Sequence, residues 1–265
     1  MNYEKYRLED LIMKLYEIYF SPTGGTQKAA DMMAHELSKD ILPVDLTDST
    51  VDFSSISLSE EDTALIAVPS YGGRVPEPAV NRLSLIKGNG AKAILLCVYG
   101  NRAYEDTLVE LEDSAKTAGF HILSAAAAIA EHSIARQFAA GRPDEKDQAQ
   151  LSGFSRQILE KISSGDMSEP SIPGDRPYKK RGGSGMVPKP GKNCVKCGLC
   201  AKKCPVQAID KDDPGKTDGN LCISCMRCIS VCPHSARKLN PVMLAAVNTM
   251  LKKACSTRKE CELYL

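Results

Sequence analysis

Eight of the eleven cysteines in this 265-residue chain lie in two short runs between positions 194 and 232. The runs read CVKCGLCAKKCP and CISCMRCISVCP, and both follow the pattern C-x2-C-x2-C-x3-C-P. This spacing is typical of two 4Fe-4S clusters, because three neighbouring thiolates surround one side of a cubane and the fourth cysteine of each run reaches the other cluster. The first predicted ligand set is Cys194, Cys197, Cys200 and Cys232, and the second is Cys204, Cys222, Cys225 and Cys228.

Zinc is the alternative metal, because paired C-x2-C spacing also occurs in sites where four cysteines bind one zinc ion. Such a site needs only two cysteine pairs. It does not require the third cysteine of each run, nor Pro205 and Pro233, which follow the fourth cysteines and turn the chain away from them. The complete runs therefore favour iron-sulfur clusters over zinc.

A second group of residues suited to ligand binding is the segment SPTGGT, residues 21–26, which opens a predicted helix. The free amides and the positive dipole end of a helix N-terminus bind phosphate, and glycines let the backbone approach it. The segment lacks the G-K-[ST] of a Walker loop and the G-x-G-x-x-G of a dinucleotide fold, which disfavours ATP and dinucleotides here. The alternative is an ordinary glycine-rich turn without a ligand.

The elements that position these residues are short apolar runs alternating with helical patterns. Five buried strands are predicted, at residues 15–20, 41–46, 64–70, 93–99 and 122–130. Strands that alternate with helices predict an α/β fold with a doubly wound parallel sheet and right-handed crossovers. The cysteine runs lie outside this pattern and predict a small α+β module of their own.

Composition limits the choice of partners and location. The length and the 43% hydrophobic content allow one full core and a second small module. The formal net charge of +1 gives no reason to expect nucleic acid or a membrane surface as a partner. We find neither a signal peptide nor a membrane-spanning run. Because cluster thiolates must stay reduced, we expect the protein in the cytoplasm.

The predicted boundaries are an α/β domain at 1–164, a linker at 165–190, the cysteine module at 191–238 and a helical tail at 239–265. The linker is rich in proline, glycine and serine, so we expect it to be semi-flexible. The tail carries an apolar stripe that should pack on a domain face. The polar residues 1–12 have no assigned role, and we expect folding and cofactor binding to survive their deletion.

The SPTGGT segment resembles the FMN phosphate loop of flavodoxins, which has the pattern T-G-x-T between first strand and first helix. The likeness extends to PSYGGRVP (69–76) and YGNRAY (99–104), which follow the third and fourth predicted strands. In a five-stranded sheet of order 2-1-3-4-5 these three loops meet at the switch point, where a ligand binds. The resemblance implies FMN, held by Ser21, Thr23, Gly24, Gly25, Thr26, Ser70, Tyr71, Gly72, Gly73, Arg74, Tyr99, Gly100, Asn101 and Tyr104.

Roles within these loops follow from side-chain type. The chain contains no tryptophan, so a stacking partner for the flavin ring must be Tyr71, Tyr99 or Tyr104. Arg74 is a candidate to offset the negative charge of the reduced flavin. His132 follows the fifth strand at the same sheet edge, and both a contact with flavin or substrate and an ordinary loop histidine remain open.

Over both domains the chain is similar to flavodoxin-ferredoxin fusions called EFR-family ferrodoxins. The resemblance implies an electron-transfer protein that passes single electrons between two 4Fe-4S clusters and FMN, with a redox protein as donor or acceptor. One alternative is a flavin-dependent reductase in which the clusters feed electrons to FMN, and FMN reduces a small organic substrate. Another is a binding protein in which the clusters are only structural.

Overall fold

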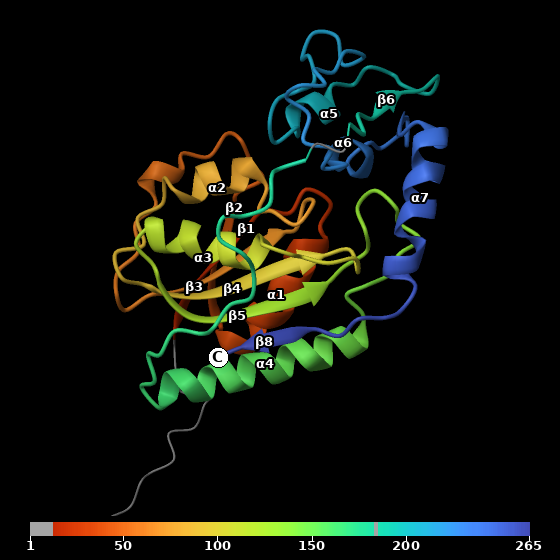
Figure 1. Ribbon diagram of the computed structural model, residues 1–265. Coiled ribbons are helices and arrows are strands. Elements are labelled where there is room, and N and C mark those ends of the chain that lie inside the picture. Colours follow the sequence, from red (N-terminus) through yellow and green to blue (C-terminus); the bar gives the residue numbers. More distant parts are fainter. Residues whose placement is uncertain (1–12, 183–184) are drawn as a thin grey trace, which may run out of the picture.

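The computed structural model describes residues 13–182 and 185–265. The prediction that residues 1–12 are dispensable concerns a segment outside the described residues. The described chain forms an α/β domain with a small cysteine module beside it, and the last residues return to the α/β domain (Figure 1).

The central sheet has the strand order β2-β1-β3-β4-β5-β8. Its five parallel strands are β1 (Lys14–Tyr19), β2 (Asp40–Asp45), β3 (Thr63–Pro69), β4 (Lys92–Tyr99) and β5 (His121–Ile129). These strands and the order 2-1-3-4-5 confirm the predicted fold. The sequence did not predict the sixth strand, β8 (Glu262–Tyr264), which pairs antiparallel with β5.

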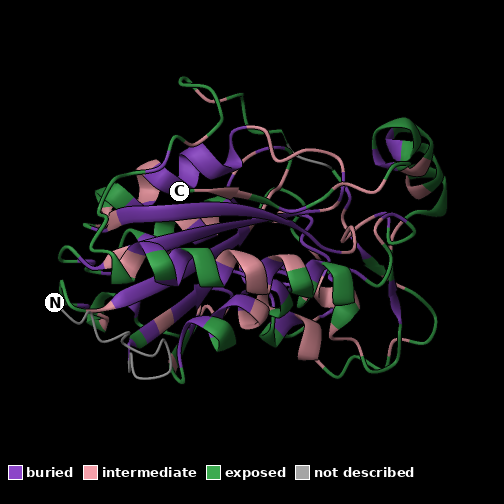
Figure 2. Cartoon of the chain, turned by 90° about the horizontal axis from the view of Figure 1, so that it is seen from below, coloured by how far each residue is buried: buried purple, intermediate pink, exposed green. Residues whose placement is uncertain are grey.

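Two helices cover each face of the sheet. The helices of the domain are α1 (Gly25–Leu37), α2 (Glu77–Leu83), α3 (Thr107–Thr117) and α4 (Glu145–Ser163), and a short 3-10 helix spans Phe53–Ser55. Side chains of α1 and α4 pack on one face, and those of α2 and α3 on the other. The inner strands β1, β3, β4 and β5 are mostly buried (Figure 2), as expected of a parallel sheet covered on both faces, whereas the edge strand β2 buries only Val44.

Glu17 is a charged residue within this core. It lies in β1 with 4% of its surface exposed, and its Oε1 atom has no hydrogen-bond partner among the described residues. Burial raises the pKa of this carboxyl to about 8, and the neighbouring Asp31 acts in the same direction. A buried acid of this kind favours its neutral form.

We expect Glu17→Gln to stabilise the protein in alkaline solution. The folded-state pKa is raised, so folding takes up a proton and the native acid loses stability as the pH rises from about 4.5 to 8. The substituted amide cannot ionise, so it avoids a buried charge, and we expect a gain of about 1–3 kcal/mol at pH 9 and almost nothing at pH 4.5. Urea unfolding followed by circular dichroism would measure this, with Glu160→Gln on the exposed side of α4 as control. An equal gain at both pH values would contradict the assignment.

Part of the predicted linker, residues 172–181, lies against the α/β domain, whereas its composition alone predicted a semi-flexible segment. Arg176 forms an ion pair with Asp113 of α3 at 2.7 Å. The backbone N–H of Lys179 donates to a carboxylate oxygen of Asp106, also at 2.7 Å. The segment 172–181 therefore runs along α3.

The cysteine module contains two very short helices, α5 (Leu199–Lys202) and α6 (Arg227–Ser230), and a two-stranded sheet of β6 (Lys189–Pro190) and β7 (Arg237–Lys238). Helix α7 (Pro241–Cys255) follows, capped by Asn240. Of the predicted apolar stripe on α7, Leu251 is buried, whereas Met243 and Met250 are exposed. None of the helices in the described ranges is both long and apolar enough to span a membrane.

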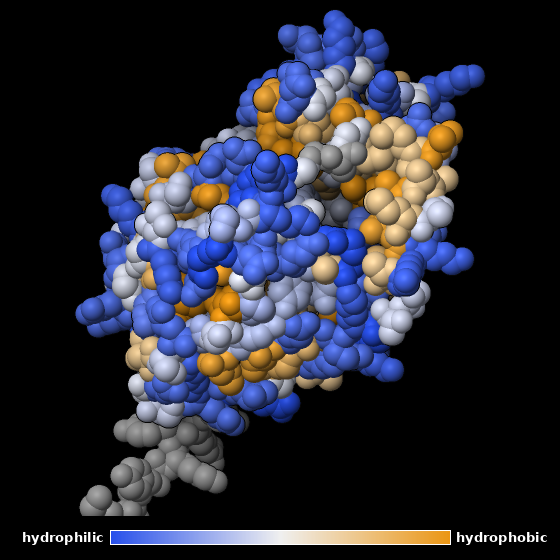
Figure 3. Space-filling model, in the orientation of Figure 1, coloured by the Kyte–Doolittle hydropathy of each residue, from blue (hydrophilic) through white to orange (hydrophobic). Residues whose placement is uncertain are grey.

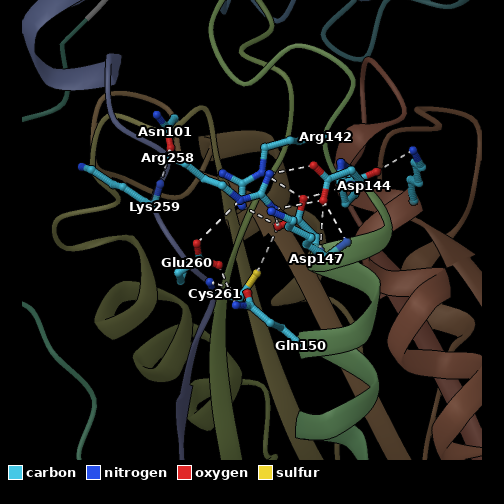
Figure 4. A network of polar contacts seen from close by, with 12 residues as sticks. Asn101, Arg142, Asp144, Asp147, Gln150, Arg258, Lys259, Glu260 and Cys261 are labelled. Atoms are coloured by element: carbon cyan, nitrogen blue, oxygen red, sulfur yellow. Dashed lines mark hydrogen bonds and ion pairs between the residues drawn. The ribbon is translucent and has the colours of Figure 1, made fainter.

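The end of the chain is held to the α/β domain by a polar network that has the buried Asp147 at its centre (Figure 4). Asp147 of α4 forms ion pairs with Arg142 and with Arg258 of the tail. Nearby, the side-chain amide of Asn101 donates to the carbonyls of Cys255, at 3.0 Å, and Thr257, at 2.8 Å. These contacts fix the segment that joins α7 to β8.

Candidate functional site

The eight cysteines of the two runs surround two separate pockets. The first cysteine pocket is lined by Cys194, Cys197, Cys200 and Cys232, and the second by Cys204, Cys222, Cys225 and Cys228. Each pocket thus combines three cysteines of one run with the fourth of the other, the same sets that the sequence predicts. That they bind iron stays a prediction.

The backbone of the two runs repeats the same turns. Gly198 and Met226 occupy equivalent positions between the second and third cysteines, and both have a positive φ, of 75° and 63°. A left-handed turn is uncommon for methionine, so the fold enforces it here. It brings three cysteines of one run to the lining of the same pocket.

Backbone amides also approach the fourth cysteine of each run. The N–H of Ala208 donates to Sγ of Cys204, and the N–H of Ala236 donates to Sγ of Cys232, both at 3.3 Å. Amides directed at sulfur stabilise a thiolate and tune a bound cluster. The residues present therefore fit a thiolate-ligated cluster in each pocket.

The two pockets differ in exposure. Cys197 of the first pocket is exposed, whereas Cys204 and Cys225 of the second are each only 8% exposed. Burial raises the pKa of the Cys225 thiol to about 12. Among the described residues, no three cysteine, histidine or acidic side chains lie close enough to hold one metal ion.

A third pocket, here named the loop pocket, lies at the N-terminus of α1. Thr23, Gly25 and Thr26 line it together with Tyr99. Helix α1 follows Gly24, whose φ is 91° and which has no side chain to cap the first turn. The hydroxyl of Ser21 accepts the N–H of Gln27, which leaves the amides of Gly25 and Thr26 facing the pocket without a side-chain cap. The site thus has the uncapped amides and the glycine backbone that a phosphate group needs.

The cysteine module adds a cation beside this loop. Arg227 donates from one guanidinium nitrogen to the carbonyl oxygens of Ser21, at 3.3 Å, and Pro22, at 3.2 Å. Its Nε is buried and has no partner among the described residues. The sequence did not predict this role, because Arg227 lies about 200 residues from the loop and only the folded arrangement brings them together.

A fourth pocket, here named the central cavity, is larger than these three: it lies between the α/β domain, the cysteine module and α7, and has a volume of about 650 Å³. It shares Ser70, Tyr71, His132 and Ser133 with the loop pocket, so the two are neighbours at the carboxyl edge of the sheet. Its volume lies within the range of pockets that bind cofactors and other small organic ligands.

One side of the central cavity is apolar and belongs largely to α7. Val247, Met250 and Leu251 line it, and Ile134 and Ile223 add to the same apolar lining. Figure 3 shows apolar side chains gathered over α7 and the neighbouring cysteine module. The polar lining includes Arg102, Arg181 and His132.

The predicted loop residues fall into two groups. Most line the loop pocket or the central cavity, among them Thr23, Gly25, Thr26, Ser70, Tyr71, Gly72, Tyr99 and Gly100. Tyr71 lines both, and burial raises its pKa, with the nearby Cys225 acting in the same direction. Tyr71 is therefore the tyrosine best placed to contact a ring in the central cavity.

Arg74, Asn101 and Tyr104 are bound elsewhere. Arg74 forms an ion pair with Glu110 at 2.7 Å, and Asn101 holds the tail as described above. The hydroxyl of Tyr104 hydrogen-bonds to Glu262 at 2.6 Å. None of these three lines either pocket in the described part of the chain.

The remaining predicted residues shape the loops and do not line a pocket. The hydroxyl of Ser21 accepts the N–H of Gln27 at 2.9 Å and so stabilises the loop internally. Gly24 and Gly73 have positive φ values and shape their turns without lining a pocket. They position the neighbouring residues that do.

Comparison with known proteins identifies the cysteine module. Residues 193–236 match the family of 4Fe-4S dicluster domains. A tetrathionate reductase subunit of Archaeoglobus fulgidus is 39% identical over 67 residues, which are 24% of this chain and 32% of that protein. A polysulfide reductase polypeptide of Wolinella succinogenes is 35% identical over 57 residues, 20% of this chain and 30% of that protein. The chain thus matches about a third of the length of these relatives.

Among solved structures, a flavodoxin of Streptococcus pneumoniae TIGR4 aligns with a TM-score of 0.39 and 22% identity, over 57% of this chain and 99% of that one. We assign the α/β domain to the flavodoxin-like doubly wound fold from its own strand order, β2-β1-β3-β4-β5. The chain therefore joins a flavodoxin-like domain to a C-terminal 4Fe-4S dicluster domain.

Proposed function

We propose that this protein is an electron carrier in which two 4Fe-4S clusters exchange single electrons with FMN. The observation that carries the proposal is the position of Cys222, which lines both the second cysteine pocket and the central cavity. A cluster bound there would lie directly beside any ligand in the cavity. Clusters carry one electron at a time and a flavin one or two, so the pair links both kinds of redox chemistry.

The pockets at the carboxyl edge of the sheet support FMN as the flavin. The phosphate would occupy the loop pocket, where the amides of α1 and the guanidinium of Arg227 offer positive charge. The ring system would lie in the central cavity against Tyr71. A flavin with a single phosphate matches a site with one phosphate loop. Finding FAD instead of FMN in the purified protein would contradict this interpretation.

The exposure of the two cysteine pockets supports a direction for electron entry. Cys197 is exposed at the first cysteine pocket, and the second adjoins the central cavity. A redox protein would exchange electrons at the first cluster, with the second cluster as the link to the flavin. Because the thiolates must stay reduced, the cytoplasm remains our proposed location.

Transfer within one chain is the expected result of the docked arrangement. We predict that, after rapid chemical reduction of the clusters, the flavin absorption bands change at a rate that does not depend on protein concentration. The modules are already in contact, so no encounter between molecules is needed. Stopped-flow spectroscopy over a tenfold concentration range measures this. A rate proportional to concentration would mean that the modules serve separate partners.

A flavin-dependent reductase is the second candidate function, and the apolar side of the central cavity favours it. An electron carrier needs no space beside its flavin, whereas Val247, Met250 and Leu251 offer a surface for an apolar organic molecule. Oxidation of the reduced flavin by small apolar acceptors, at saturable rates, would support this candidate. If Met250→Asp leaves the rates of flavin oxidation by these acceptors unchanged, the result supports the electron-carrier function.

A further inference from the structure

His132 stands where the loop pocket and the central cavity adjoin. It lines both, together with Ser70, Tyr71 and Ser133. An FMN molecule that places its phosphate in one and its ring in the other must pass these residues. The state of the His132 ring therefore bears directly on how a flavin is bound.

One nitrogen of the His132 ring is engaged by the backbone. Nδ1 accepts the N–H of Ile134 at 3.2 Å and the N–H of Ala135 at 3.1 Å. A nitrogen that accepts two N–H groups does not carry a hydrogen itself. The ring hydrogen is therefore on Nε2, since the bond made by one ring nitrogen decides which form is present.

The rest of the ring is held in place by packing. A Cβ atom added at Gly100 would lie 2.6 Å from Cδ2 of His132, so only glycine allows the ring to approach the loop this closely. The backbone N–H of His132 donates to the carbonyl of Phe138 at 3.1 Å. No hydrogen bond to Nε2 is found among the described residues, so this N–H remains available for a ligand.

Burial, together with the charged groups around His132, favours the neutral form of its ring. Burial lowers its pKa, and the positive charge of Arg102 acts in the same direction. Glu131 is the adjacent acid, but it is paired with Arg136 at 2.5 Å. Across the cavity lie Glu77 and Arg181, whose charges oppose one another. Protonation of Nδ1 would also break its two hydrogen bonds, so His132 acts as a donor and not as an acid.

We propose that His132 is a flavin-binding residue that donates a hydrogen bond from Nε2 to an acceptor atom of FMN. This rests on the proposed function, because it requires FMN to span both pockets. Reduction increases the negative charge on the flavin, so a fixed donor stabilises the reduced form more than the oxidised one. His132 thereby raises the reduction potential of the flavin without adding a charge to the site.

Two substitutions test the position of the donor. His132→Gln places an amide N–H where Nε2 was, whereas His132→Asn places its amide near Nδ1. We expect His132→Asn to weaken FMN binding about tenfold, as for one lost hydrogen bond, and to make the flavin potential more negative. His132→Gln should recover most of both. FMN affinity is measured by fluorescence quenching on titration of flavin-depleted protein, and iron content and circular dichroism verify folding.

Further measurements separate this proposal from the proposed function. Gly100→Ala should move the ring and weaken FMN binding similarly, with no additional loss when combined with His132→Asn. Between pH 7 and 8 the pH dependence of FMN affinity should be the same in the wild type and in His132→Gln, since the phosphate ionises equally in both and a neutral donor adds no titration of its own. If the wild type binds FMN and His132→Asn binds it with the same affinity, the role of His132 is overturned and the proposed function is not. No FMN binding by the wild type would overturn both proposals.

Discussion

We expect Cys204→Ala to remove the cluster held by Cys222, Cys225 and Cys228 and to leave the other in place. Cys204 belongs by sequence to the first run, but its thiol lies in the second cysteine pocket. With three protein ligands the cubane is less firmly bound. The module has only a few buried apolar side chains that could keep the pocket closed around it. Iron content should fall from about eight to about four atoms per chain.

Alkylation followed by mass spectrometry identifies the cluster that is lost. In Cys204→Ala, iodoacetamide should modify Cys222, Cys225 and Cys228 and spare the first set. Cys232→Ala is the matched control and should expose Cys194, Cys197 and Cys200 instead. Modification of the first set in Cys204→Ala would show that each run binds its own cluster. Zinc in place of iron in the wild type would contradict the cluster assignment as a whole.

The same pair of variants also tests the electron path. Because the second cysteine pocket adjoins the central cavity, Cys204→Ala should abolish transfer to the flavin while the first cluster can still be reduced. Cys232→Ala should keep electron transfer between the second cluster and the flavin, but should lose the first cluster, where electrons are proposed to enter. The order of the two clusters would thus be read from two single substitutions.

The sheet could be predicted from sequence because buried parallel strands are encoded in continuous apolar runs. Each of the five predicted strands lies within about one residue of its observed bounds, as for residues 93–99 against Lys92–Tyr99. Strand β8 has only three residues and a mixed polarity that indicates no strand. It forms because the exposed edge of β5 is available for pairing, which is a property of the folded domain.

The loops of the site could be predicted from sequence, but not the direction of every side chain. Asn101 and Tyr104 lie in the predicted third loop, yet the tail and β8 occupy their polar groups. Those partners are more than 150 residues away in the chain. Local sequence shows which residues reach the sheet edge, whereas distant segments decide which of them remain available.

Contacts between the modules could not be predicted from sequence for the same reason. Arg227 is one of many basic residues in the cysteine module, and the sequence gives no sign that it reaches the loop that contains Ser21 and Pro22. The proline-rich linker has a flexible composition, but contacts such as the ion pair of Arg176 with Asp113 place residues 172–181 along α3. Contact between the modules thus places residues that look like ordinary surface residues in the sequence beside the candidate site.

The second large effect is expected at Asp147, the centre of the network in Figure 4. Its carboxylate is fully buried and accepts hydrogen bonds from Arg142, from Arg258 at 3.0 Å and from the backbone N–H of Asp144 at 2.8 Å. Arg142 has only 5% of its side chain exposed. Asp147→Ala would leave this guanidinium buried without a partner, and we expect a loss of about 3–5 kcal/mol in the free energy of unfolding.

Asp113→Ala is the matched control for this loss. It breaks an ion pair with Arg176 in which half of the arginine side chain is exposed, so the expected cost is at most about 1 kcal/mol. Arg258→Ala removes the tail's part of the network but keeps Arg142 paired, and its cost should lie between the two. Unfolding midpoints in urea, measured under anaerobic conditions, would rank the three variants. Equal losses for Asp147→Ala and Asp113→Ala would contradict the role of burial.

The network also connects stability to the site, because the tail that it holds carries α7. Arg258 follows α7 closely in the chain, and Val247, Met250 and Leu251 of α7 line the central cavity. If Arg258→Ala loosens the tail, trypsin should cleave near Lys252 and Lys253 faster than in the wild type, and FMN should dissociate faster. The global fold should persist, since the pair of Arg142 and Asp147 is intact. Faster cleavage with unchanged FMN release would mean that α7 covers the cavity without retaining the flavin.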